Sequence, residues 1–250
     1  NLTGGIILAG SGSDEITISG YVNDRAIIDL GTGNSRGTDY SGSDTGGDLV
    51  TDVNTLTITG DFDGAFLYGS QGLDKVTING QIKGSNTIDL GAGDDTFTYG
   101  GTTISGVIVG GAGTDTLVLT YNKDTSLTTG ISANAHITNL SSANFTGFEV
   151  IKMQGNNVVD IAYKDLLNDT TNTGPLYIQG TNTSKVDLGS TNWSSDTLAQ
   201  RSLTDTGGGS WALSQSSVNV GGVLYNVYHH SSAGSDISND VYIQQGIIVI

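Results

Sequence analysis

Short runs of alternating apolar and polar residues recur in the first half of the chain, each directly after a glycine-rich phrase. One example is Gly110-Gly-Ala-Gly-Thr-Asp115, which is followed by Leu117-Val-Leu119. The alternation predicts a short strand with one buried face, and the glycines with the aspartate predict a tight turn before it. The phrases are Gly10–Asp14, Gly31–Asn34, Gly69–Asp74, Gly91–Asp95 and Gly110–Asp115. Repetition of turn, acid and strand predicts a stack of similar β-coils.

The distance between phrases gives the size of the predicted coil. Gly12 and Gly33 are 21 residues apart, as are Gly72 and Gly93, and Gly113 follows Gly93 by 20 residues. We therefore predict an all-β fold in which residues 1–121 form a parallel β-solenoid, with about 20 residues and two strands per coil. Stacking would bring strands of successive coils to about 4.8 Å from one another.

Stacking would also align the apolar residues of successive coils in columns. A single coil cannot bury both faces of its strands, so neighbouring coils supply the core. Three inward columns are predicted: Ile7, Ile28, Leu67, Ile88 and Ile108 before the turn, Ile16, Leu56, Val76, Phe97 and Leu117 after it, and then Ile18, Ile58, Ile78, Tyr99 and Leu119.

The period is interrupted once. Residues 35–53 are a surplus rich in Gly, Ser and Asp, which predicts an insertion that leaves the coil at a turn. The pattern resumes with Leu56-Thr-Ile58, so Asn54 takes the aspartate position of that coil. The acids of the insertion either complete a separate cation site or only keep the loop soluble: Asp39, Asp44, Asp48 and Asp52.

Composition adds a preference for one acid. Of the 25 acidic residues only Glu15 and Glu149 are glutamate, which leaves 23 aspartates, and the net charge is −16. Aspartate is the acid of turns and of hard-cation oxygen sites, whereas a merely soluble surface would use glutamate as readily. Such acidity argues against a nucleic-acid partner.

The stacked turns predict calcium sites. Without a cation, the carboxylates of Asp74, Asp95 and Asp115 would repel one another along a column. A Ca²⁺ ion between successive turns would take oxygens from the aspartates and from backbone carbonyls. The predicted ligand residues, with the weakest site at Asp14, are Asp14, Asp74, Asp94, Asp95, Asp115, Gly72, Gly93 and Gly113. We expect the calcium-free chain to be largely unfolded.

Other functional classes find little support in the sequence. Cysteine is absent, so neither a disulfide nor a thiolate metal site is possible. No apolar run is long enough to span a bilayer, and Asn1 opens no secretory signal peptide. Gly33-Asn-Ser35-Arg-Gly37 matches the G-x-S-x-G nucleophile motif, but no helical pattern follows it and no histidine lies near it in sequence. We predict no enzymatic activity.

Two further binding functions are weighed against simpler interpretations. His229-His230, near Asp236 and Asp240, would suit a transition metal, although an exposed loop pair is the simpler interpretation. Outward threonines form a column of the kind that orders water on ice-binding solenoids, although threonine is also an ordinary exposed strand residue. That column contains Thr17, Thr57, Thr77 and Thr98. Ice or surface binding is therefore an alternative function.

The second half, residues 122–250, predicts further β structure that caps the solenoid. Gly221-Gly222 is expected to turn a β-hairpin. The stretch Thr191–Ser217, rich in Ser, Thr and Gly, predicts a loop anchored by Trp193 and Trp211.

Two resemblances point to one family. Gly110–Leu119 fits the G-G-x-G-x-D-x-U-x repeat of RTX proteins closely, and the other phrases fit it loosely. The family pattern repeats about every nine residues with acids on both sides of the roll, whereas here one side carries the acid. Segments of the second half resemble the tail of large RTX adhesins of Gram-negative bacteria: Asn144–Met153, Val158–Asp169, Leu176–Gly180, Val186–Gly189, Val218–Tyr228 and Val241–Ile250.

The resemblance implies export by a type I secretion system. Members of the family carry an uncleaved C-terminal signal for an ABC transporter, which here would lie in the segment ending at Ile247–Ile250. They stay unfolded in the cytosol and fold in extracellular calcium. The chain thus resembles a monomeric calcium-dependent folding, export and capping module at the C-terminus of a surface adhesin for attachment and biofilm. The alternative is the C-terminal RTX module of a secreted enzyme or toxin.

Overall fold

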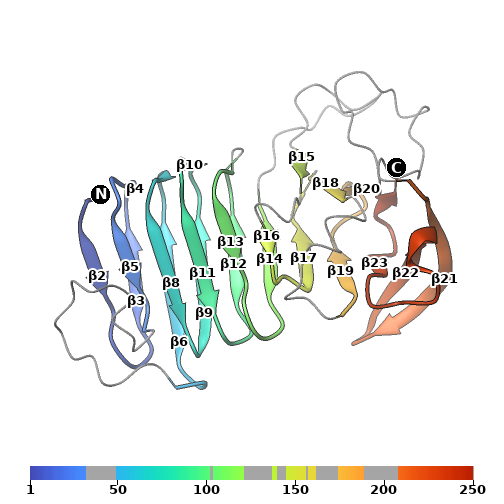
Figure 1. The fold of residues 1–250 in the computed structure, drawn as a ribbon, viewed down its shortest axis with the longest axis horizontal. Coiled ribbons are helices and arrows are strands. Elements are labelled where there is room, and N and C mark those ends of the chain that lie inside the picture. Colours follow the sequence, from blue (N-terminus) through green and yellow to red (C-terminus); the bar gives the residue numbers. More distant parts are fainter. Residues whose placement is uncertain are drawn as a thin grey trace. The chain divides into compact units, whose positions relative to one another are not determined.

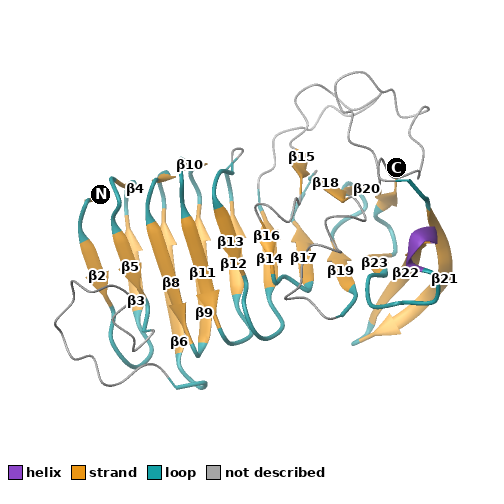
Figure 2. Ribbon diagram, viewed as in Figure 1, coloured by secondary structure: helices purple, strands orange, loops and turns teal. Residues whose placement is uncertain are grey.

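The structure, a computed structural model, describes residues 1–31, 49–101, 104–120, 137–139, 145–155, 157–161, 174–188 and 208–249. Within these residues the regular structure is β-strand, apart from one short 3-10 helix, η2 (Ser231–Ala233) (Figures 1 and 2). Most neighbouring strands are parallel. These observations confirm the prediction of an all-β fold rich in parallel sheet. No helix of the described residues has the length and hydrophobicity to cross a membrane.

The chain divides into two compact units, Asn1–Leu117 with Ala143–Phe148, and Val118–Ser142 with Glu149–Ile250. In the first unit, successive repeats contribute strands to three parallel ladders (Figure 1). The ladder before the acidic turn contains β2 (Ile6–Leu8), β5 (Ile27–Asp29), β8 (Phe66–Ser70), β11 (Thr87–Gly91), β13 (Val107–Val109) and β16 (Phe145–Thr146). The ladder after the turn contains β3 (Glu15–Ile18), β6 (Val53–Ile58), β9 (Leu73–Ile78), β12 (Thr96–Tyr99) and β14 (Thr116–Leu119).

The register of these ladders confirms the predicted apolar columns. Ile28 pairs with Leu67, Leu67 with Ile88, and Ile88 with Ile108, and all four side chains are fully buried. The column after the turn is aligned in the same way, from Ile16 through Leu56 and Val76 to Phe97 and Leu117. The members of the third column are all buried: Ile18, Ile58, Ile78, Tyr99 and Leu119.

The third ladder corrects the prediction of two strands per coil. It consists of the two-residue strands β1 (Leu2–Thr3), β4 (Val22–Asn23), β7 (Phe62–Asp63) and β10 (Ile82–Lys83). Val22, Phe62 and Ile82 stack in register and are fully buried, so they add a fourth apolar column to the three that were predicted. A two-residue strand is too short to show alternation, and the apolar residue two positions after Gly20, Gly60 and Gly80 was its only signal in the sequence.

The second unit contains two sets of strands. One set, in sheet order, is β17 (Val150–Met153), β19 (Leu176–Gln179), β23 (Val241–Gln244), β22 (Val223–His230) and β21 (Trp211–Val220). The other is a parallel sheet of β15 (Ile137–Asn139), β18 (Val158–Ile161), β20 (Lys185–Leu188) and β24 (Ile248–Val249).

The β21–β22 hairpin confirms one prediction and corrects another. Val220 pairs with Val223 across Gly221-Gly222, whose φ angles of 59° and 89° are those of a tight hairpin turn. The loop predicted to extend to Ser217 is wrong from Trp211 onward, because that part is strand β21. The Trp211 ring packs edge-on against His230, with ring centroids 5.0 Å apart. Trp193 lies outside the described residues.

Candidate metal centre

The aspartates that end the glycine-rich phrases form a buried column in the first unit. Asp74, Asp95 and Asp115 are each at most 1% exposed. The backbone N–H of Asp74 donates to Oδ1 of Asp95 at 2.7 Å, and the N–H of Asp95 donates to Oδ1 of Asp115 at 2.8 Å. We call the aligned residues Asp14, Asn54, Asp74, Asp95 and Asp115 the acidic ladder. The structure therefore brings together the three predicted carboxylates, on the inner side of the turn.

Asn54 takes the aspartate position of its repeat, as predicted. Its Oδ1 accepts the N–H of Asp14 at 3.0 Å, and its Nδ2 donates to Oδ1 of Asp74 at 2.9 Å and to the carbonyl of Leu30 at 3.0 Å. Asp14 therefore lies against an amide and not against a second carboxylate. The weaker calcium site predicted at Asp14 stays a prediction.

Ser70 is a hydrogen-bond partner of the acidic ladder that was not predicted from the sequence. Its N–H and its hydroxyl both donate to Oδ2 of Asp74, at 2.6 and 3.1 Å. Together with Asn54, these donors satisfy both oxygens of the Asp74 carboxylate. The signal in the sequence was a serine at a position that is glycine in the other phrases, such as Gly91, with which Ser70 pairs.

The carboxylate of Asp95 is only partly hydrogen-bonded by the described residues, as is that of Asp14. Its Oδ2 is buried and accepts no hydrogen bond from any described residue. Burial raises the pKa of Asp95 to about 8, and the charges of Asp74, Asp115 and Asp94 act in the same direction, against the N–H of Asp74, which lowers it. Near neutral pH this carboxyl group therefore needs either a proton or a cation to be stable in the fold.

The predicted glycines form a second column beside the carboxylates. A Cβ at Gly93 would lie 2.1 Å from the carbonyl oxygen of Gly72, and a Cβ at Gly113 would lie 1.9 Å from that of Gly93. Their φ angles of 132° and 145° also belong to a region that L side chains rarely adopt. Each carbonyl oxygen thus points toward the next turn. Backbone carbonyl oxygens are among the ligand atoms that calcium prefers.

The other predicted acids that the structure describes are not buried in this column. Asp94 is exposed, and its Oδ1 accepts the N–H of Thr114 at 2.8 Å. Asp52 closes a local turn by accepting the N–H of Leu49 at 2.8 Å. Three further acids of the insertion (Asp39, Asp44 and Asp48) and the Ser35 motif lie outside the described residues.

The ligand atoms available at the acidic ladder restrict which metal ion it can bind. Among the described residues, no three His, Cys, Asp or Glu side chains converge in a geometry that could hold a metal ion. A cation beside Asp95 would therefore take most of its ligands from backbone carbonyls and water. Ca²⁺ accepts six to eight oxygens of exactly these types, whereas transition metals favour nitrogen and sulfur.

The His229-His230 pair lies at the end of strand β22, so the prediction of an exposed loop is wrong. His230 is 1% exposed and packs on Trp211. Both ring nitrogens of His229 face oxygen atoms, Oδ1 of Asp240 at 2.6 Å and the carbonyl of Gly234 at 3.0 Å. The transition-metal interpretation has no support here, because neither nitrogen of His229 is directed to an open position.

Comparison with known proteins gave no matching family, no matching characterised protein and no matching solved structure. The geometry of the ladder is therefore the basis for the function proposed below.

The raised pKa of Asp95 predicts how the metal-free protein responds to pH. The folded state holds this proton up to about pH 8, whereas the unfolded state loses it near 3.8. Between these values the folded state binds more protons, so the free energy of unfolding falls as the pH rises. In chelator, the fraction of folded protein, measured by far-UV circular dichroism, should therefore be larger at pH 5 than at pH 8. Asp95→Asn should weaken this dependence, and an unchanged dependence in that variant would contradict the assignment to Asp95.

Proposed function

We propose that the chain is a non-enzymatic, calcium-folded β-solenoid, and that the acidic ladder is its calcium-binding element. The observation that carries this proposal is the carboxylate of Asp95, which is 1% exposed, lies between Asp74 and Asp115, and has one oxygen that accepts no hydrogen bond from the described residues. A buried, uncompensated charge destabilises a fold unless it is neutralised or paired. A divalent cation provides that compensation for more than one carboxylate at once.

Repetition supports the solenoid interpretation. Residues 20 or 21 apart are direct neighbours, as in the pairs Thr77–Thr98 and Ile88–Ile108, so one repeat is one turn of the chain through the three ladders. An insertion separates Ile18 from Ile58 by 40 residues, yet these two residues are also paired. The coil thus keeps its register on both sides of the insertion.

The wider biological role rests on the resemblance to RTX adhesins. In this proposal the chain is secreted through a type I ABC transporter by means of its C-terminal segment, and it folds when it meets extracellular calcium. At the surface of a Gram-negative bacterium it would then form a stable, calcium-dependent part of an attachment protein. A secreted RTX enzyme or toxin would use the same module in the same way, with its activity elsewhere in the protein.

Calorimetric calcium titration of the wild type and of Asp95→Asn tests the binding site. The wild type should bind calcium, and Asp95→Asn should bind at least about tenfold more weakly, because a charged ligand becomes neutral. Asp61→Asn is the matched control, since Asp61 lies outside the ladder and its side chain pairs with Lys83. Absence of calcium binding by the wild type, or equal affinity in Asp95→Asn, would overturn the proposal.

A second candidate function, binding to ice or to another ordered surface, is supported by a file of threonine residues on neighbouring strands. Thr17, Thr57, Thr77 and Thr98 are paired in register on neighbouring strands, so their side chains form one regular file on the outer side of the sheet. A regular file of hydroxyl and methyl groups suits binding to ordered water or to a crystalline surface. Freezing-point hysteresis in the presence of calcium tests this candidate, and its complete absence would end it.

A further inference from the structure

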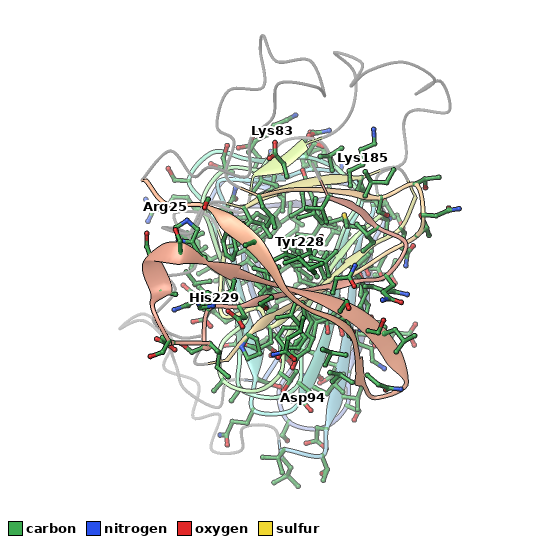
Figure 3. All side chains as sticks on the ribbon, turned by 90° about the vertical axis from the view of Figure 1, so that its right-hand side faces the viewer. Arg25, Lys83, Asp94, Lys185, Tyr228 and His229 are labelled. Carbon is green, nitrogen blue, oxygen red and sulfur yellow. The ribbon has the colours of Figure 1, made fainter. Side chains whose placement is uncertain are left out.

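His229, labelled in Figure 3, lies near the end of strand β22. Both of its ring nitrogens contact the connection between β22 and β23. Nδ1 is 2.6 Å from Oδ1 of Asp240, and Nε2 is 3.0 Å from the backbone carbonyl of Gly234. The side chain of Asp240 is 6% exposed and that of His229 is 22% exposed, so the pair is largely shielded from water.

The chemistry of the two partners determines the charge of the ring. A carbonyl oxygen and an ionised carboxylate only accept hydrogen bonds, and a neutral imidazole carries one N–H. A neutral His229 would therefore place a nitrogen lone pair against an oxygen lone pair at one of the two contacts. Only the imidazolium form, with an N–H on each nitrogen, satisfies both.

The contacts of His229 fix a segment of ten residues. Within this segment the N–H of Asp236 donates to the carbonyl of Ala233, and the N–H of Asp240 donates to the carbonyl of Ile237, both at 3.1 Å. At its end, the carbonyl of Asp240 accepts the N–H of Leu176 at 3.1 Å, beside the β19–β23 pairing. His229 thus links strand β22 to the start of β23.

The other groups around His229 favour the same charge. Asp236 and Asp240 are the acids whose charges act on the ring, and both come from the connection. The residue opposite on strand β21 is Ala212, which is uncharged. No cation is among the groups that perturb the ring, so nothing opposes its protonation except partial burial.

We propose that His229 is a pH-sensitive clasp: its imidazolium form holds the Ser231–Asp240 connection against strand β22, and loss of one ring proton releases that connection. The clasp lies in the second unit and does not depend on the acidic ladder. The hydrogen bond to Asp240 raises the pKa of His229 above its usual value near 6.5 and outweighs burial, which lowers it. A raised folded pKa means that the stabilisation is complete below about pH 6.5 and is lost as the pH rises through the folded value.

The test is an NMR titration of the imidazole nitrogens in the full chain with calcium held constant. At pH 6 both ring nitrogens of His229 should give imidazolium shifts, and the titration midpoint should lie above 6.5. The amide protection factors of Asp236 and Asp240 should fall about tenfold as the pH is raised through that midpoint.

Two Asp→Asn variants distinguish the effect of the Asp240 hydrogen bond from the effect of nearby negative charge in general. Asp240→Asn should lower the His229 midpoint, because it removes the carboxylate that accepts from Nδ1, whereas Asp236→Asn, which removes an exposed acid of the same connection, should change it little. A wild-type midpoint at or below 6.5 would overturn the proposal, as would equal midpoints in wild type and Asp240→Asn or protection that does not change with pH.

Discussion

Replacing Gly93 with alanine is expected to lower the free energy of unfolding of the first unit by about 4 kcal/mol. At φ 132° an L side chain is strained by about 1–3 kcal/mol. The new Cβ would also lie 2.1 Å from the carbonyl oxygen of Gly72, a backbone atom that moves only if the turns separate. Urea unfolding at constant calcium concentration measures the loss.

Gly12→Ala is the matched control for this substitution. Gly12 lies at the same position of the first phrase, and its φ of 103° is also positive, but a Cβ there meets no atom within 4 Å. The control should show only the backbone part of the effect, about 1–2 kcal/mol. Equal losses at Gly12 and Gly93 would contradict the claim that the close approach of stacked turns requires glycine.

Replacing Phe97 with alanine is expected to lower the free energy of unfolding by about 3–5 kcal/mol. Phe97 is fully buried and pairs with Val76, so the substitution leaves a cavity that the neighbouring repeats cannot fill. The same urea measurement applies. The loss should be concentrated in the repeats next to Phe97, because each repeat contacts only its neighbours.

Thr98→Ala provides the comparison on the other face of the same strand. Thr98 is only partly buried and points outward, so its truncation should change stability by no more than about 0.5 kcal/mol. If Phe97→Ala were as mild as Thr98→Ala, the inward column would not be the core of the first unit.

Much of the first unit was predictable from the sequence, because the constant repeat length and the apolar–polar alternation together determine which residues pair on neighbouring strands. A constant spacing aligns residue with residue, so the pairs Leu67–Ile88 and Leu56–Val76 follow once the period is known. Asn54 was recognised for the same reason, from its position before Leu56. The short third ladder was not, because two residues such as Phe62-Asp63 contain no period.

Two other features were not predicted, each for a different reason. Strand β21 has the polar run Ser214–Ser217 in its middle and is exposed along most of its length, so it lacks the apolar alternation of a buried strand. The burial of Asp74 was encoded, since it shares strand parity with Val76 and Ile78 and must face inward with them. An acid on an apolar face is so unusual that the turn, and not the core, was the expected location.

Far-UV circular dichroism with and without calcium tests most directly whether calcium in the acidic ladder holds the fold together. In excess chelator at pH 8 the β-sheet signal should be largely lost, and calcium should restore it in step with stoichiometric binding of the ion. Identical spectra in chelator and in excess calcium would contradict the account.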